Sequence, residues 1–133
     1  MSAEAGRLAA FLEATPYAGF LGVEARWVDG AVAVVLPFRD TLVGNIQLPA
    51  LHGGVLGGFL ELTALMTLAT ITDSSRLATV DFTIEYLRGA GPRDTHAKAT
   101  IKRLGRRFAN IEAVAWQDDP AKPVAAISGR FSV

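Results

Sequence analysis

The segment HGGVLGGFLE, residues 52–61, opens a long apolar run that continues to about Ile71. After His52, and apart from three threonines, the only polar side chain in this run is the carboxylate of Glu61. A helix that is apolar on all sides is normally buried, and a carboxylate is almost never fully buried without a partner or a chemical task. Each of the four glycines in the first two turns costs about 1 kcal/mol relative to alanine. That cost indicates that another helix or a ligand approaches the backbone closely.

The length and composition predict one domain over residues 1–133, with a helical N-terminal segment over residues 1–20. Half of the residues are hydrophobic, and the mean hydropathy is positive. We therefore expect a homo-oligomer, because a subunit interface hides apolar surface. The formal net charge is zero, so electrostatics gives no reason to expect binding to nucleic acid or to an anionic membrane.

The residue types present exclude several kinds of site. There is no cysteine, which excludes disulfides, a thiol nucleophile and cysteine-based metal sites. His52 and His96 are too few for the usual metal sites without several carboxylates, so we expect no metal. Residues 1–7 lack the pattern of a signal peptide. The apolar run is slightly short for a membrane span and carries Glu61, so we expect a cytoplasmic protein.

Hydrophobic periodicity predicts the secondary structure. A helix over 3–14 ends at Pro16, and Asp29-Gly30 between two apolar runs is a strong hairpin signal. Strict alternation over 76–88 predicts a half-buried strand whose even-numbered residues, including Tyr86, face one way and whose odd-numbered residues, including Thr79, face the other. The expected helices cover 3–14 and about 53–71, and the expected strands cover 21–28, 31–38, 76–88, 95–104, 108–116 and 124–133.

This order of elements predicts a two-layer α+β domain. The last four strands follow one another through short turns, so we expect them to pair antiparallel with their neighbours in sequence. The sheet can cover one side of the long apolar helix. A second copy of the chain is the simplest cover for the remainder.

The same order resembles the hotdog fold, in which a long central helix is wrapped by a curved antiparallel sheet of about six strands. His52-Gly53-Gly54 at the helix start, with an acid at Glu61, resembles the acyl-CoA thioesterases of the PaaI-like and 4-hydroxybenzoyl-CoA groups. Residues 79–88 and Gly105-Arg106-Arg107 also resemble segments of the PaaI-like group. The resemblance runs from about Leu21 onward and implies a thioester hydrolase.

Two positions depart from the PaaI-like pattern. The usual acid is aspartate, whereas the longer Glu61 is closer to one branch of the 4-hydroxybenzoyl-CoA thioesterases. A polar residue usually lies six positions before the histidine, where this chain has Ile46. Asn45 or Gln47 would fill that role, and we favour Asn45.

Hydrolysis of a thioester requires polarisation of its carbonyl group and an attacking group. The backbone N–H of Gly53, at the helix N-terminus, can serve as an oxyanion-hole donor. Glu61 would act as nucleophile or as general base for water, and the sequence does not choose between them. Eight residues of helix separate the two by about 12 Å. The chemistry therefore predicts a site formed by two chains.

Supporting roles are predicted for other residues, each beside a purely structural alternative. His52 would assist catalysis or simply cap the helix, and the resemblance implies that the Thr79 hydroxyl lies near the attacking water. Arg106 and Arg107 would bind the phosphates of coenzyme A, because guanidinium groups match phosphate geometry; Arg88 is a weaker candidate. The acyl pocket would be lined by Gly54, Leu56, Phe59, Leu60 and Leu65, with room left by Gly57 and Gly58.

The sequence thus predicts an acyl-CoA thioesterase that acts on a small aromatic or medium-chain acyl group. It would need no cofactor, coenzyme A being part of the substrate. We expect a homodimer that pairs further into a tetramer, although the sequence leaves dimer and tetramer open. The alternatives are a non-catalytic acyl-CoA-binding module, which would need no acid such as Glu61, and an acyl-thioester hydratase or dehydratase, which usually needs an Asp and a His together.

Overall fold

A computed structural model of the chain describes residues 2–45, 47 and 49–133, with the backbone alone for Asn45 and Ser74. In this part of the chain the helices are α1 (Ala3–Glu13), α2 (Pro16–Leu21) and α3 (Gly53–Ala69). The strands are β1 (Glu24–Val28), β2 (Ala31–Leu36), β3 (Val43–Asn45), β4 (Ala50–Leu51), β5 (Ala78–Tyr86), β6 (Thr95–Leu104), β7 (Phe108–Trp116) and β8 (Ala125–Ser132).

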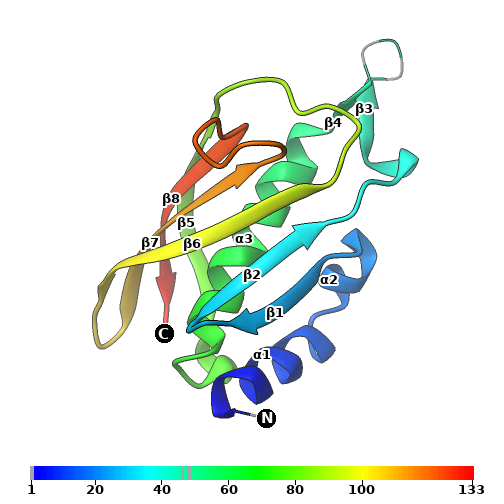
Figure 1. The fold of residues 1–133 in the computed structure, drawn as a ribbon. Coiled ribbons are helices and arrows are strands. Elements are labelled where there is room, and N and C mark those ends of the chain that lie inside the picture. Colours follow the sequence, from blue (N-terminus) through cyan, green and yellow to red (C-terminus); the bar gives the residue numbers. More distant parts are fainter. Residues whose placement is uncertain (1, 46, 48) are drawn as a thin grey trace.

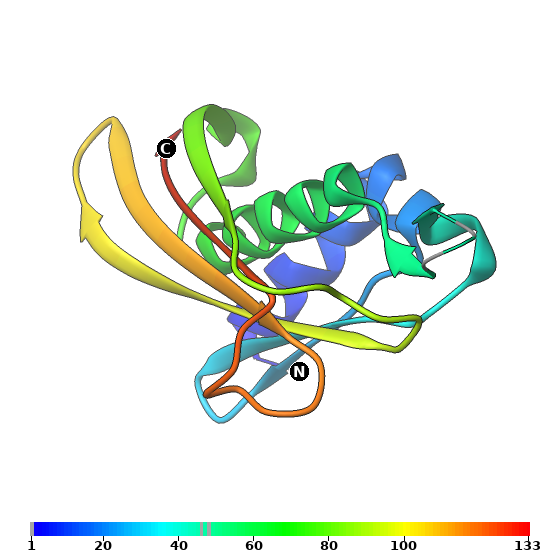
Figure 2. The ribbon, with the colours of Figure 1, turned by 90° about the horizontal axis from the view of Figure 1, so that it is seen from above.

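The main sheet is antiparallel and curves around α3 (Figures 1 and 2). Its six strands follow the order β1-β2-β6-β7-β8-β5, and β3 and β4 form a separate two-stranded ribbon. A long helix wrapped by a six-stranded curved sheet confirms the α+β hotdog fold expected from the sequence.

The pairing of β5 differs from the expectation. We predicted that β5 would pair with the next strand along the chain, β6, but it pairs with β8. Strand β6 lies between β2 and β7 instead. Residues 87–94 are long enough to carry the chain from the sheet edge to its middle. Strand β5 is therefore an edge strand, hydrogen-bonded on one side only within the described residues.

The N-terminal region contains one helix more than periodicity predicted. The helix expected over 3–14 is present as α1 and ends before Pro16. Pro16 then begins α2, since proline suits the first position of a helix. Gly22 ends α2 with a left-handed backbone (φ 79°). The strand expected from residue 21 accordingly begins at Glu24. The expected loop over 39–52 contains a 3-10 turn and the β3–β4 ribbon.

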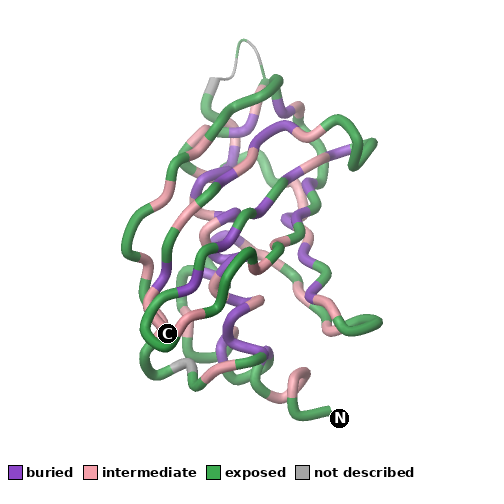
Figure 3. Tube along the Cα trace, turned by 90° about the vertical axis from the view of Figure 1, so that its left-hand side faces the viewer, coloured by how far each residue is buried: buried purple, intermediate pink, exposed green. Residues whose placement is uncertain are grey.

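Helix α3 is buried on most of its circumference. Residues such as Phe59, Leu60 and Met66 are fully covered, by the inner face of the sheet and by α1. Figure 3 shows the buried positions recurring along the strands between exposed ones. One stripe of α3 stays partly accessible. We call this stripe the open face of α3; its members, spaced by four, three and four residues, are Gly54, Gly58, Glu61 and Leu65.

The described helices are all too short or too polar to cross a membrane.

Candidate active site

His52 fixes the start of α3. It follows β4 directly, and its backbone N–H donates to the carbonyl of Leu42 at 2.9 Å. Its side chain caps the helix, because Nδ1 accepts a hydrogen bond from the N–H of Gly54 at 2.9 Å. The His52 ring therefore holds the first turn of α3 in place.

The first-turn N–H groups of α3 differ in their partners. Val55 and Leu56 donate to the carbonyl of His52 at 3.0 and 3.2 Å, and Gly54 donates to the His52 ring. The N–H of Gly53 donates no hydrogen bond to any described residue. A helix N-terminus carries partial positive charge. The Gly53 N–H is thus a candidate donor to a developing oxyanion.

Glu61 lies on the open face of α3, half-buried. The Thr79 hydroxyl donates to its Oε2 at 2.6 Å. This bond joins the carboxylate to edge strand β5 and orients it. The structure therefore brings together two of the residues predicted for catalysis, Glu61 and Thr79.

The alternation predicted for β5 is wrong at Thr79, because a bulge lies between Thr79 and Asp81. The extra residue turns Thr79 to the same face as Phe82 and Tyr86, the face that looks toward α3. Gly129 pairs opposite Phe82, and a Cβ at Gly129 would come within 2.7 Å of the Asp81 carbonyl oxygen. A glycine within a strand pattern signals a bulge or close backbone approach, so Gly129 was the signal that could have revealed this geometry.

Gly53 and Glu61 do not meet within one chain. Both lie on the straight course of α3, about 12 Å apart along its axis. They contact opposite ends of β5: the Tyr86 hydroxyl donates to the Gly53 carbonyl at 2.9 Å, whereas Thr79 near the strand start bonds Glu61. Tyr86 was not predicted as a site residue.

The polar loop residue expected before His52 is only partly described. Asn45 pairs with Ala50 in the β3–β4 ribbon, and its side chain lies outside the described residues, as does Ile46. Gln47 is exposed in the segment that joins the two strands. Both candidates therefore lie in the ribbon that leads into His52.

The predicted phosphate-binding arginines lie at the turn between β6 and β7. Arg106 and Arg107, with Arg103 and Arg130, line a surface hollow of about 380 Å³. This turn lies at the end of the sheet opposite to the start of α3 (Figure 1). Arg88 is exposed just after β5, at the other end.

Other titratable groups add little to the site. Across residues 2–45, 47 and 49–133, no three His, Asp or Glu side chains gather as metal ligands would. The pKa of Asp73, in the turn beyond the C-terminal end of α3, is held below its usual value by the hydrogen bond from the backbone N–H of Ser75 (3.0 Å).

The predicted acyl-pocket residues divide into two groups. Leu56, Phe59 and Leu60 are buried in the core of the chain itself. Their side chains are therefore not accessible to an acyl group in this structure. This is a correction: their faces of α3 pack against the sheet. Gly54 is exposed and Leu65 is half-buried, both on the open face.

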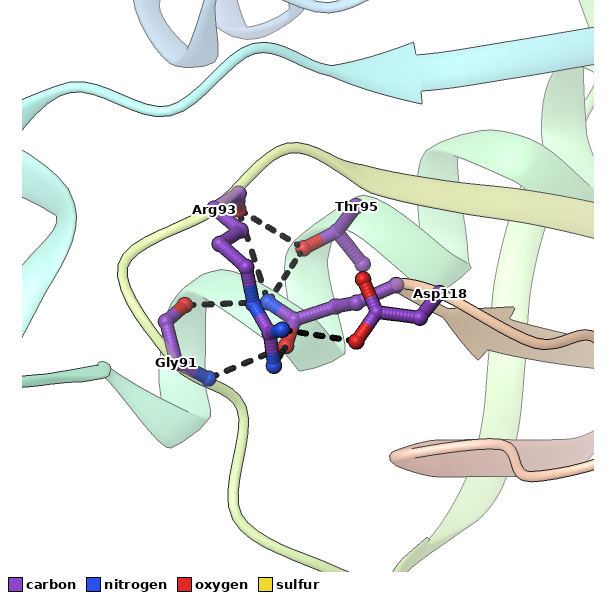
Figure 4. A network of polar contacts seen from close by, with 5 residues as sticks. Gly91, Arg93, Thr95 and Asp118 are labelled. Atoms are coloured by element: carbon purple, nitrogen blue, oxygen red, sulfur yellow. Dashed lines mark hydrogen bonds and ion pairs between the residues drawn. The ribbon is translucent and has the colours of Figure 1, made fainter.

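Buried Gln117 stabilises the segment that precedes His52. The side chain of Gln117 accepts from the Gly91 N–H (3.0 Å) and donates to the Gly91 carbonyl (2.9 Å). Arg93 and Thr95 complete this network (Figure 4). The neighbouring Ala90 carbonyl accepts from the N–H of Leu51 in β4. The network thereby stabilises β4, the strand before His52. No motif in the sequence predicted this network.

Comparisons with known proteins agree with this architecture. A sequence model described as the thioesterase superfamily matches residues 48–124, more than half of the chain. A solved structure from Chromobacterium violaceum is 34% identical, with a TM-score of 0.74 over 95% of this chain and 88% of its own. A phenylacetic acid degradation-related protein from Ralstonia eutropha is 27% identical (TM-score 0.78; 96% and 99% covered). The E. coli PaaI protein from the phenylacetic acid degradation operon is 18% identical (TM-score 0.81; 98% and 92% covered), which shows similarity of fold alone. No curated protein sequence matches the chain.

Proposed function

Because the chain belongs to the thioesterase superfamily, we propose that it hydrolyses an acyl-CoA thioester to the free acid and coenzyme A. One observation carries this proposal. A single helix presents a backbone N–H without a described partner at Gly53 and a carboxylate oriented by Thr79 at Glu61.

The two groups have complementary tasks. The Gly53 N–H donates to the thioester oxygen as negative charge develops on it. As general base, Glu61 takes a proton from water as the water oxygen bonds to the carbonyl carbon. The carbon–sulfur bond then breaks, and the thiolate of coenzyme A receives a proton. As nucleophile, a Glu61 carboxylate oxygen would bond to the carbonyl carbon while the carbon–sulfur bond breaks and the coenzyme A thiolate leaves and takes up a proton. Water would then hydrolyse the resulting mixed anhydride to the free acid and the Glu61 carboxylate.

The separation of these groups supports a site shared by two chains. About 12 Å of helix axis is too far for both to contact one carbonyl group. Strand β5 is an edge strand beside the open face of α3, so a second copy can approach there. In such a homodimer, Gly53 of one protomer would face Glu61 of the partner subunit.

The positions of the arginines are consistent with the same arrangement. Arg106 and Arg107 lie at the Thr79 end of the sheet, far from Gly53 of their own chain (Figure 1). In an antiparallel dimer they would come near the partner's Gly53 and bind the coenzyme A phosphates. The acyl group would lie against the open face of α3, near exposed Gly54.

The test is release of free thiol from a panel of acyl-CoAs and aryl-CoAs. The panel should include phenylacetyl-CoA, because one similar structure is named for phenylacetic acid degradation. We expect hydrolysis by the native protein and a loss of orders of magnitude in Glu61→Ala with the oligomer intact. Binding of a CoA ester without turnover by either protein would favour a binding module instead.

A further inference from the structure

Tyr86 makes one hydrogen bond at the start of α3. Its hydroxyl donates to the carbonyl of Gly53 at 2.9 Å. The residue is 57% exposed, so burial of its ring is not what holds it there. The catalytic steps described above do not use this side chain.

The carbonyl bonded by Tyr86 belongs to the peptide unit between Gly53 and Gly54. The N–H of that same unit donates to Nδ1 of His52 at 2.9 Å. One peptide plane is therefore held at both ends, by side chains from β5 and from the residue before α3. Two consecutive glycines are conformationally permissive, and these two bonds restrict the pair in the first turn.

We propose that Tyr86 is a positioning residue that, together with His52, orients the Gly53 N–H as oxyanion donor. This inference rests on the proposed thioester hydrolysis. The N–H of Gly53 itself belongs to the preceding peptide unit, whose carbonyl, that of His52, accepts from Val55 and Leu56. With the peptide units on both sides of Gly53 held, its φ and ψ angles are restricted. Its N–H then points in one direction before substrate arrives, as preorganised electrostatic stabilisation requires.

The identity of residue 53 fits this role. A Cβ at Gly53 would lie 3.1 Å from the Tyr86 hydroxyl oxygen and 3.3 Å from its ring carbon Cζ. Glycine thus leaves the space that the tyrosine hydroxyl occupies. The two residues form a matched pair across β5 and α3.

The test compares Tyr86→Phe with Thr83→Val. Tyr86→Phe keeps the ring and removes the hydroxyl. Thr83→Val removes a hydroxyl from the same strand on the face away from α3, since Thr83 pairs with exposed Ser128. We expect kcat to fall about tenfold in Tyr86→Phe with KM unchanged, since small misplacement of a catalytic group has effects of this order. Thr83→Val should match the native protein.

A second readout needs no substrate. In ¹⁵N NMR spectra, Tyr86→Phe should shift the Gly53 and Gly54 amide signals and reduce the hydrogen-exchange protection of Gly54, and Thr83→Val should not. Unchanged amides together with native kcat would overturn the positioning role. If the native protein hydrolyses no thioester but the amide signals shift in Tyr86→Phe, the proposed function would be overturned. The finding that Tyr86 and His52 hold the Gly53–Gly54 peptide unit would remain valid.

Discussion

The Thr79 hydroxyl donates a 2.6 Å hydrogen bond to Oε2 of Glu61. The bond crosses from edge strand β5 to the middle of α3 and depends on the bulge that turns Thr79 inward. Glu61 is half-buried, with one carboxylate oxygen fixed by Thr79. Under the proposed mechanism, the other oxygen would meet water or the acyl carbon. Glu61 is thereby oriented from outside its own helix.

Removing this hydroxyl should impair turnover. We expect Thr79→Val, which keeps the side-chain shape, to lower kcat by about 10- to 100-fold, because a hydrogen bond to a charged group is worth about 1.5–3 kcal/mol. Thr79→Ser, which keeps the hydroxyl, should retain most activity. Steady-state kinetics on the best substrate of the panel would measure both. Equal activity of the Val and Ser variants would argue that Glu61 needs no such partner.

The role of the Gly53 N–H can be separated from the role of its missing side chain. Gly53→Pro removes the N–H, and proline is favoured at the first position of a helix. The extended backbone of His52 (ψ 135°) suits a residue that precedes proline. We expect Gly53→Pro to lose about 10²–10³-fold in kcat, as for other oxyanion donors.

Gly53→Ala is the matched control, because it adds a Cβ while it keeps the N–H. Its Cβ meets the Tyr86 hydroxyl at 3.1 Å, so a smaller loss is expected. If the two variants were equally active, the Gly53 N–H would have no part in the chemistry. Circular dichroism and thermal unfolding should show both variants folded.

The helix cap of His52 gives a prediction about stability. Asparagine is a good cap whose side-chain oxygen accepts from an N–H of the first turn. His52→Ala should therefore lower the free energy of unfolding by about 1 kcal/mol, and His52→Asn should restore most of it. Urea denaturation followed by tryptophan fluorescence would measure the difference. A His52→Ala protein as stable as the native one would show that the ring bond to Gly54 is of no consequence.

The Gln117 network predicts a larger effect on stability. Replacing Gln117 by leucine would leave the N–H and carbonyl of half-buried Gly91 without their partners. A fully buried group left unsatisfied costs about 1–3 kcal/mol, so we expect a total loss of about that size. Asp118→Ala is the control, because it removes only the exposed ion pair with Arg93 (2.6 Å). Urea midpoints should fall clearly for Gln117→Leu and little for Asp118→Ala; the reverse order would contradict the assignment.

Periodicity predicted much of the fold. The apolar run after Gly53 predicted the central helix, and the alternation around Phe82 and Ile111 predicted strands that the structure contains. It failed where one residue changes the geometry. The bulge after Thr79 brings this residue to the face of Phe82 and Tyr86, and Pro16 begins a second helix after α1 has ended. The predicted antiparallel pairing is confirmed for β6 with β7 and for β7 with β8. Only the partner of β5 differs, because β5 pairs with β8 and not with its neighbour in sequence.

Individual residues of the site could be predicted from the sequence, but the contacts between them could not. Glycines and a lone carboxylate in an apolar helix pointed to Gly53 and Glu61. The burial of Leu56 and Phe59 could not be predicted, because an all-apolar helix does not show which of its faces meets the sheet. Tyr86 reads as an ordinary strand residue, and only the crossing of β5 over the start of α3 gives it a partner.

The central claim is that Gly53 and Glu61 act on one thioester from two chains. Gly53→Pro and Glu61→Ala, each inactive alone, should be unfolded together in equal amounts and refolded as a mixture. Each site then draws its two groups from the two chain types at random, so we predict about one quarter of native activity, as expected for a symmetric shared site. A mixture as inactive as its two parents, with oligomers of native size, would contradict the shared site.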